Sequence, residues 1–142
     1  MPTIANSVHI EAPVDKVFAY VTDPMNATEW FVGMMGVNDV TGKGVGKHYH
    51  WKYKMIGVPL HGEGTITEYV PNERMVVESK GGVTSKITYT FASDAAGTTL
   101  NAETEYTIPV PVLGKLAEKL VLQRNRRESE MSMQNVKERM EG

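Results

Sequence analysis

Apolar and polar residues alternate through most of the chain before residue 109. Ile4, Val8 and Ile10, for example, share one face of a segment whose other face is mainly polar. This period of two is typical of strands with one buried face, and turn residues separate the segments. Strands linked in this way predict an antiparallel sheet with one covered face. The predicted strands are Thr3–Glu11, Val37–Val40, His48–Met55, Leu60–Val70, Met75–Lys80, Val83–Phe91 and Leu100–Ile108.

Helical spacing replaces this alternation in three places. A short helix is predicted to begin at Pro13 and to end before Pro24, and a second covers Met25–Trp30. No glycine or proline occurs between Gly114 and Gly142, and strong helix formers dominate that segment. We therefore predict a long C-terminal helix, which needs a sheet against which to bury one of its faces.

The apolar positions of this long helix form two groups on nearly opposite faces. The first group is Leu113, Leu116, Ala117 and Leu120, and the second is Leu122, Ser129, Met133, Val136 and Met140. One straight helix cannot bury both groups against one sheet, and we expect the second group to face it. The first group predicts a bend between Leu120 and Arg124 or a lid, with contact to a second protomer or to a membrane surface as alternatives.

Composition narrows the classes of function. A chain of 142 residues predicts one domain over residues 1–142. The net charge of −2 gives no electrostatic reason to expect nucleic acid, and the absence of cysteine from the sequence excludes disulfides and thiolate chemistry. The sequence begins with no signal-peptide pattern and contains no apolar run near the ~20 residues of a membrane span. We therefore expect a cytoplasmic protein without integral membrane contact.

The histidines do not predict a metal site. A tight hairpin around Gly57-Val58 places His48 and His50 on one strand, with His61 opposite Lys54 on the next. In this register His61 is about 13 Å from His50, at about 3.3 Å per residue, which is too far for one shared ion. Lysines between the histidines would also repel a cation. We therefore expect solvated histidines and no metal.

Few titrating groups point toward the predicted covered face. Most carboxylates fall on outer positions, and strict alternation turns Glu68 inward unless a β-bulge intervenes. The inner polar groups are mainly tyrosine hydroxyls, which either orient a ligand or belong to core aromatics with one hydrogen bond. We name Glu68, Tyr49 and Tyr89 as catalytic candidates but assign no catalytic residue.

Several short motifs follow one another in an order that characterises a known fold. They are Ile10–Pro24 followed by Trp30, Gly44–Gly46 before a strand, Ile66–Pro71, and Met133–Lys137. With these motifs the chain resembles the START-like (SRPBCC) superfamily and, within it, the polyketide cyclase/dehydrase and lipid-transport family. The resemblance implies an α+β helix-grip fold, in which a curved antiparallel sheet of about seven strands wraps around a long C-terminal helix. An elongated apolar cavity lies between sheet and helix in that family.

Such a cavity implies that the partner is a small hydrophobic or aromatic ligand, such as a lipid or a polyketide, bound without a cofactor. Alternation and resemblance together select the residues that we expect to line it. They are Trp30, Phe31, Tyr49, Trp51, Tyr53, Ile66, Val77, Ile87, Tyr89, Phe91, Tyr106, Leu120 and Met133.

Two other functions stay open. One is an enzyme of the cyclase or dehydratase type, in which cavity tyrosines and Glu68 position an enol. The other is a protein-interaction module that binds a partner through the apolar start of the last helix. The partner could be a second copy of the chain, which would form a homodimer. An inward Glu68 with a raised pKa favours the enzyme, whereas a cavity volume well under about 300 Å³ favours the interaction module.

Overall fold

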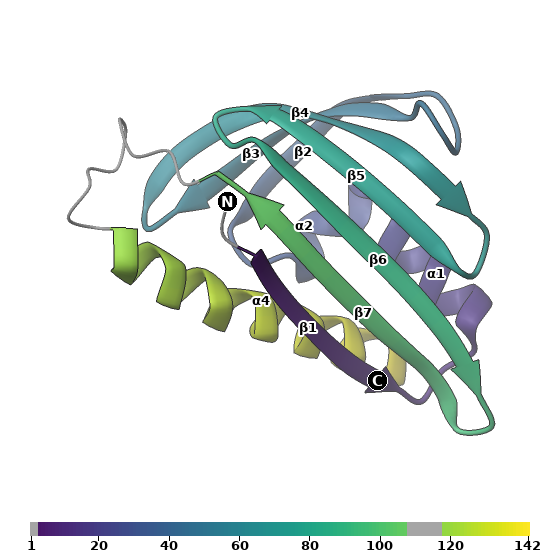
Figure 1. Cartoon of the computed structure of the whole chain (residues 1–142). Coiled ribbons are helices and arrows are strands. Elements are labelled where there is room, and N and C mark those ends of the chain that lie inside the picture. Colours follow the sequence, from purple (N-terminus) through teal and green to yellow (C-terminus); the bar gives the residue numbers. More distant parts are fainter. Residues whose placement is uncertain (1–2, 108–117) are drawn as a thin grey trace.

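The computed structural model describes residues 3–107 and 118–142, which form one curved sheet around a long helix (Figure 1). Neighbouring strands are antiparallel, as the alternating sequence predicts. The strands are β1 (Thr3–Ile10), β2 (Met34–Thr41), β3 (His48–Met55), β4 (Val58–Val70), β5 (Arg74–Gly81), β6 (Ser85–Asp94) and β7 (Gly97–Tyr106). The helices are α1 (Val14–Thr22), the short 3-10 helix η1 (Pro24–Asn26), α2 (Ala27–Trp30) and α4 (Glu118–Glu141).

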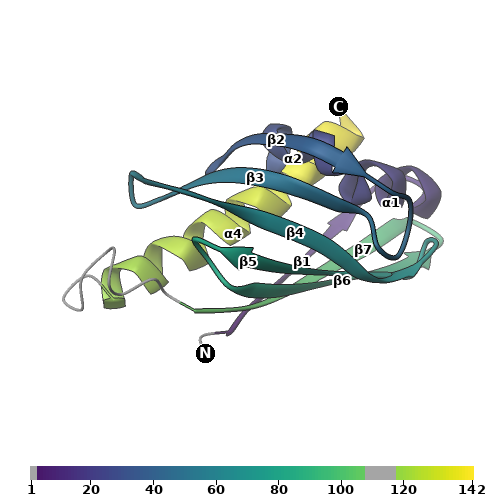
Figure 2. The same cartoon turned by 90° about the horizontal axis from the view of Figure 1, so that it is seen from above.

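The strand order, β1-β7-β6-β5-β4-β3-β2, places the first two strands at opposite edges of the sheet. Helices α1 and α2 connect these edges, and they lie with α4 on one side of the sheet (Figure 2). Helix α4 packs against β1, α1 and α2. This arrangement confirms the α+β helix-grip fold with a seven-stranded sheet. Among the described residues, no helix is long and apolar enough to cross a membrane.

The hairpin between β3 and β4 turns one residue earlier than the sequence analysis predicts. Ile56 and Gly57 form its two-residue turn, with φ angles of 49° and 74°. Positive φ at both positions is typical of a type I′ turn, which favours glycine at the second of them. The predicted pairing of β3 with β4 is therefore wrong by two residues. His50 lies opposite Glu63 instead of Thr65.

Helix α4 buries the second of the two apolar groups. Met133 and Val136 are buried in the main core, as predicted. Val121, which the prediction omitted, is fully buried nearer the start of the helix. Leu120 is exposed, and α4 continues as one helix through residues 120–124, where we predicted a bend or a lid. The other members of the first group, Leu113, Leu116 and Ala117, lie outside the described residues.

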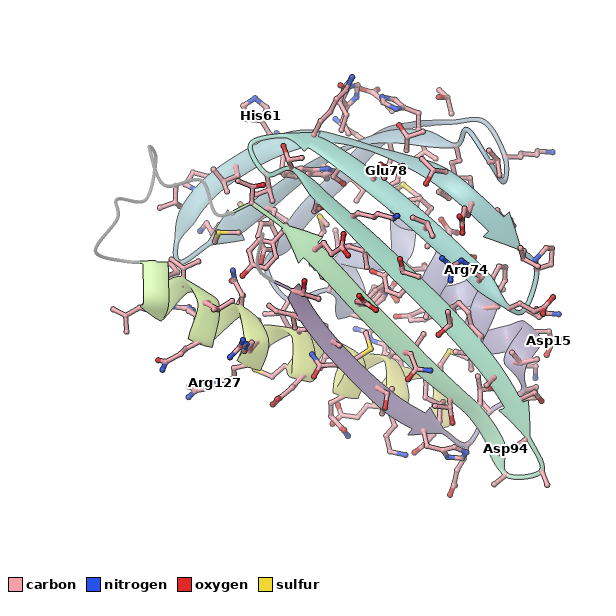
Figure 3. The ribbon with its side chains drawn as sticks, in the orientation of Figure 1. Asp15, His61, Arg74, Glu78, Asp94 and Arg127 are labelled. Atoms are coloured by element: carbon pink, nitrogen blue, oxygen red, sulfur yellow. The ribbon has the colours of Figure 1, made fainter. Side chains whose placement is uncertain are left out.

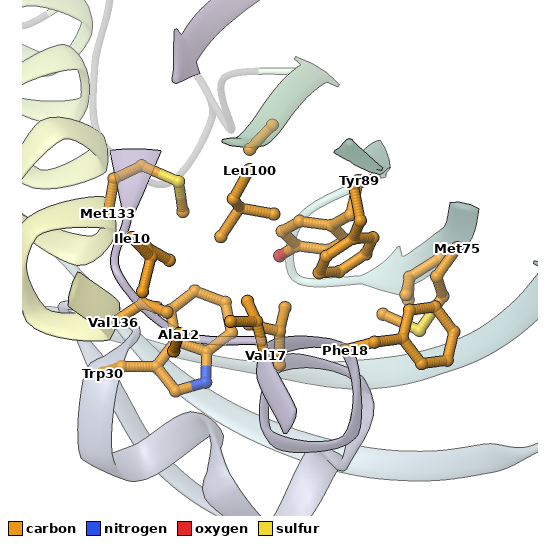
Figure 4. Close-up of a cluster of buried hydrophobic side chains, with 14 of the residues drawn as sticks. Ile10, Ala12, Val17, Phe18, Trp30, Met75, Tyr89, Leu100, Met133 and Val136 are labelled. Atoms are coloured by element: carbon orange, nitrogen blue, oxygen red, sulfur yellow. The ribbon is translucent and has the colours of Figure 1, made fainter. Parts of the chain in front are cut away.

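Two clusters of buried side chains join the sheet to the helices. In the larger one, Met133 of α4 and Trp30 of α2 face Tyr89 and Leu100 of the sheet (Figure 4). The smaller cluster includes Val121 of α4 and side chains from β1, β3, β4 and β7. Residues of both clusters line the cavity between sheet and helix.

Candidate functional site

A cavity of about 160 Å³ lies between the sheet and helix α4. Its volume is below the roughly 300 Å³ at which drug-sized ligand pockets begin. Most of the residues predicted to line it, from alternation and resemblance together, are inward positions of strands, because every second residue of a strand points to the same face of the sheet. All but two of the predicted lining residues belong to the cavity wall: Trp30, Phe31, Tyr49, Trp51, Tyr53, Ile66, Val77, Ile87, Tyr89, Tyr106 and Met133.

Two predicted lining residues lie elsewhere. Phe91 is buried, but its ring packs edge to face against Phe18 of α1, with 5.0 Å between ring centroids and 68° between ring planes. Leu120 is 65% exposed, because it lies on a face of α4 that is turned away from the sheet. Both corrections depend on how the helices pack, which the alternation within the strands does not describe.

Helix α4 contributes a polar stripe to the cavity, of which the sequence analysis predicted only Ser129 to face the sheet. Asn125, Glu128, Ser129 and Ser132 line the wall beside Met133. These residues recur at intervals of three or four, as the predicted sheet-facing positions Met133 and Val136 do, so they lie on the same face of the helix. This spacing could have identified them, but polar side chains on a helix usually indicate a face in contact with water.

Hydrogen bonds hold two of these polar side chains in place. Asn125 Nδ2 donates to the Tyr106 hydroxyl at 2.9 Å, and this contact joins α4 to β7. Arg124 Nε donates to Glu128 Oε1 at 3.1 Å within the helix. The first bond uses the amide nitrogen of Asn125 and the second uses one carboxylate oxygen of Glu128. The amide oxygen Oδ1 of Asn125 and the other carboxylate oxygen, Oε2 of Glu128, have no hydrogen-bond partner among the described residues.

Four buried polar atoms in the cavity wall have no hydrogen-bond partner among the residues that the structure describes. They are Trp30 Nε1, Trp51 Nε1, Asn125 Oδ1 and Glu128 Oε2. Two are N–H donors and two are oxygen acceptors. An unsatisfied buried polar group costs roughly 1–3 kcal/mol, so such groups are few in native proteins. All four belong to residues that line the cavity, so unpartnered donors and unpartnered acceptors both occur in its lining residues.

Burial keeps the cavity tyrosines protonated. It raises the pKa of Tyr49 to about 12. Burial, with a smaller contribution from Tyr49, raises the pKa of Tyr89 still further. The pKa of Tyr53 is also raised, first by burial and then by the nearby Glu128 carboxylate. These hydroxyls are therefore hydrogen-bond donors at neutral pH, and none of the three is suited to act as a general base.

The folded protein should ionise its tyrosines at higher pH than the unfolded chain. Tyr49 keeps its proton to about pH 12 in the folded state, whereas an unfolded tyrosine loses its proton near pH 10. The stability contributed by Tyr49 is therefore present below about pH 10 and is lost as the pH rises through about 12. Tyrosinate absorbance at about pH 11 should be lower for the folded protein than for the protein in guanidinium. Tyr49→Phe should reduce the difference, and equal absorbance in both states would contradict the burial of these rings.

Glu68 lies on the outer face of the sheet and not in the cavity. A β-bulge between Ile66 and Glu68 shifts the alternation of the strand. From the sequence we expect Glu68 to point outward if such a bulge is present. Arg74, labelled on β5 in Figure 3, donates from Nε to Glu68 Oε2 at 2.6 Å. This hydrogen bond lowers the pKa of Glu68. Glu68 therefore has neither the inward position nor the raised pKa that would favour the enzyme.

His48 and His50 converge on Glu63 across strands β3 and β4. Their Nε2 atoms lie 3.3 and 3.2 Å from Glu63 Oε1. Hydrogen bonds from the two histidines lower the pKa of Glu63. The separation that argued against a metal site depended on the incorrect register. Within residues 3–107 and 118–142, these three side chains form the one group whose ligand atoms are close enough to share a metal ion.

Several solved structures share this fold, whereas no curated protein sequence matches the chain. TTHA0849 from Thermus thermophilus is 20% identical, covers 98% of this chain and 97% of its own, and has a TM-score of 0.84. CV1439 from Chromobacterium violaceum is 20% identical over 100% and 99% of the two chains, with a TM-score of 0.75. The Aha1 dimer from Colwellia psychrerythraea is 15% identical over 99% and 97%, with a TM-score of 0.66. At these identities the likeness shows the fold alone.

A family profile gives a more specific result. The family described as polyketide cyclase / dehydrase and lipid transport matches residues 1–141. This match covers nearly the whole chain and confirms the resemblance that the motifs indicate. The chain therefore belongs to the polyketide cyclase/dehydrase and lipid transport family.

Proposed function

We propose that the protein binds a small apolar molecule with hydrogen-bonding groups in the cavity between the sheet and α4. The observation that carries this proposal is the set of four unpartnered buried polar atoms, counted over the described residues, in a largely aromatic wall. A ligand that accepts from a tryptophan N–H and donates to Asn125 or Glu128 would satisfy these atoms while it buries its apolar body. Membership of the family supports a hydrophobic ligand.

The volume of the cavity favours a compact ligand over a long one. At about 160 Å³, the space suits a molecule with one or two rings better than a fatty acid or a tetracyclic polyketide. A lipid or a large polyketide would require the wall to move. We therefore infer a small aromatic or alicyclic compound that carries a hydroxyl or carbonyl group.

NMR spectroscopy provides a direct test, because the chain has two tryptophans and both line the cavity. The probes are 2-naphthol and naphthalene, which share an apolar body and differ by one hydroxyl. We expect 2-naphthol to shift the indole N–H signals of Trp30 and Trp51 saturably. One hydrogen bond to a charged group contributes about 1.5 kcal/mol, so 2-naphthol should bind roughly tenfold more tightly than naphthalene.

Variants on α4 test which groups the ligand contacts. Glu128→Gln and Asn125→Leu should each reduce the preference for 2-naphthol over naphthalene. Glu130→Gln makes the same change as Glu128→Gln at an exposed position of the helix and should leave the preference unchanged. The proposal fails if these probes and a panel of fatty acids, sterols, quinones and aromatic polyketides leave both indole signals unmoved. Native mass spectrometry of protein from its own host should detect a small molecule that co-purifies.

A second candidate function is proton transfer of the cyclase or dehydratase type. Glu128 favours it, because it is the only carboxylate among the described residues that line the cavity, and its Oε2 is buried. In this alternative Glu128 moves a proton while tyrosine hydroxyls such as that of Tyr53 donate to a substrate carbonyl. Glu128→Gln should then abolish turnover of an aromatic polyketide yet leave its binding constant within a few fold. A change in binding alone favours the first proposal.

A third candidate is a protein-interaction module, which the small cavity and the exposed Leu120 favour. The Colwellia protein of the same fold is described as a dimer, and this supports a second copy of the chain as the partner. Analytical ultracentrifugation should then show a dimer that Leu120→Asp weakens. If the protein is a monomer at all concentrations and binds the probes saturably, the interaction module is excluded and the ligand proposal is supported.

A further inference from the structure

We propose that His48, His50 and Glu63 bind a divalent first-row transition metal ion, with Zn²⁺ the best match, on the outer face of the sheet. His48 and His50 are two residues apart on β3, so their side chains share one face. His50 pairs directly with Glu63 on β4. The three ligand atoms lie within 4.8 Å of one another. None of the three residues lines the cavity, so this site is separate from the proposed ligand site.

The spacing of the donor atoms fits tetrahedral coordination. The Nε2 atoms of His48 and His50 are 3.3 and 3.2 Å from Glu63 Oε1. Two donors bound to one zinc ion at roughly 2.0–2.1 Å stand about 3.3–3.4 Å apart at the tetrahedral angle. The two separations that involve Glu63 therefore already match this value, and the ligand atoms of His48 and His50 lie within 4.8 Å of each other. The side chains of His48, His50 and Glu63 also remain 33%, 45% and 38% exposed, respectively, so that water can complete the coordination.

Each imidazole is oriented through its other ring nitrogen. His50 Nδ1 lies 3.1 Å from Asp39 Oδ2, and His48 Nδ1 lies 2.9 Å from Thr65 Oγ1. When Nδ1 carries the proton and donates it to these oxygens, Nε2 presents its lone pair toward Glu63. Ligating histidines in protein metal sites are held in this way by a carboxylate or another acceptor behind the ring.

The same contacts explain why a cation suits this position. Carboxylate oxygens face both nitrogens of His50, yet a neutral imidazole has one N–H. The short contact between His50 Nε2 and Glu63 Oε1 therefore needs a positive centre, which is either a proton on Nε2 or a bound cation. When a metal ion replaces that proton, Nδ1 keeps the N–H that it donates to Asp39. Lys80 is a competing cation, but its Nζ is 3.9 Å from the other oxygen, Oε2, and its side chain is 78% exposed. Oε1 therefore remains directed at the histidines.

The ligand set also limits the choice of metal. Imidazole with one carboxylate suits zinc, copper and nickel, whereas magnesium and calcium prefer oxygen ligands. A bound ion would connect three neighbouring strands, because Asp39 lies on β2, the histidines on β3 and Glu63 on β4. We therefore expect the metal to stabilise this half of the sheet and to raise the melting temperature.

Calorimetric titration of untagged, chelator-treated protein with ZnCl₂ tests the site. We expect one ion per chain. His50→Gln and Glu63→Gln should each weaken Zn²⁺ binding by more than about tenfold, and Asp39→Asn by about tenfold. His61→Gln is the matched control, since His61 is on the same outer face of β4 but pairs with Lys52 (Figure 3). This variant should bind Zn²⁺ as the wild type does.

Thermal unfolding gives a second readout, because saturating Zn²⁺ should raise the melting temperature of the wild type but not of His50→Gln. Circular dichroism establishes that each variant is folded before titration. Equal Zn²⁺ affinity in the wild type and Glu63→Gln would overturn the proposal, as would saturation only at millimolar Zn²⁺. An equal loss in His61→Gln and His50→Gln would also overturn it. The indole signals of Trp30 and Trp51 report on the cavity, so the metal and ligand proposals are tested independently.

Discussion

Leu100→Ala should unfold about 10 °C below the wild-type protein, as measured by circular dichroism. Leu100 is fully buried in the main cluster. Truncation removes apolar contact and leaves a cavity, which for Leu→Ala costs about 3 kcal/mol within a range of roughly 2–5. In a domain of this size, each kcal/mol corresponds to roughly 3–4 °C in melting temperature.

Leu120→Ala is the matched control, because it makes the same chemical change at a side chain that is 65% exposed. Substitutions at such positions usually change stability by less than about 0.5 kcal/mol. A loss as large as that of Leu100→Ala would mean that Leu120 packs against another surface, such as a second protomer. Such a result would favour the interaction module, because Leu120 is exposed in the isolated chain.

Gly62→Ala should destabilise the protein by about 2 kcal/mol and displace the ring of Trp51. A Cβ atom on Gly62 would stand 2.5 Å from Trp51 Cζ2 and closer still to the carbonyl oxygen of Lys80. That carbonyl belongs to the neighbouring strand β5, so it cannot move aside as the end of a flexible side chain does. Urea denaturation measures the loss of stability, and the indole N–H signal of Trp51 reports the displacement.

Gly36→Ala controls for the general effect of replacing a strand glycine. A Cβ atom on Gly36 has no heavy atom within 4 Å among its described surroundings, and neither Gly36 nor Gly62 has a positive φ angle. We expect a change of less than about 0.5 kcal/mol, or slight stabilisation through reduced entropy of the unfolded chain. If Gly62→Ala is equally harmless, the close approach of Trp51 and β5 to Gly62 is wrong.

The fold was predictable from the sequence because its signals are local. Alternation marks strand residues within a few positions, and the predicted His48–Met55 strand has the same bounds as β3. The pairing of β3 with β4 is different, because a shift of two residues leaves every side chain on the same face. Alternation therefore cannot distinguish the two registers. The preference for Gly57 at the second position of a type I′ turn was the available discriminating signal.

The residues of the candidate site also fall into those that local sequence patterns predict and those that depend on how distant parts of the chain pack. Inward positions of the strands, such as Tyr49 and Tyr89, follow from period two once the covered face is known. Asn125 and Glu128 were not identified, because a polar residue on a helix normally indicates contact with water. Whether such a residue faces solvent or a cavity depends on how the helix packs. The metal proposal likewise required the correct register, since only then does His50 meet Glu63.

The strand order also has a consequence for the assembly of the protein during synthesis. Strand β1 pairs with β7, so that Ile4 lies opposite Thr104, and Asn6 donates to Ser129 of α4 at 2.7 Å. Contacts between such distant parts of the chain slow folding, because long loops must close before these contacts form. During synthesis, β1 cannot form these contacts before β7 and α4 have left the ribosome. We therefore expect the inner face of the sheet to stay open until α4 has been synthesised, and the proposed ligand could be enclosed at that stage without passing through a completed cavity wall.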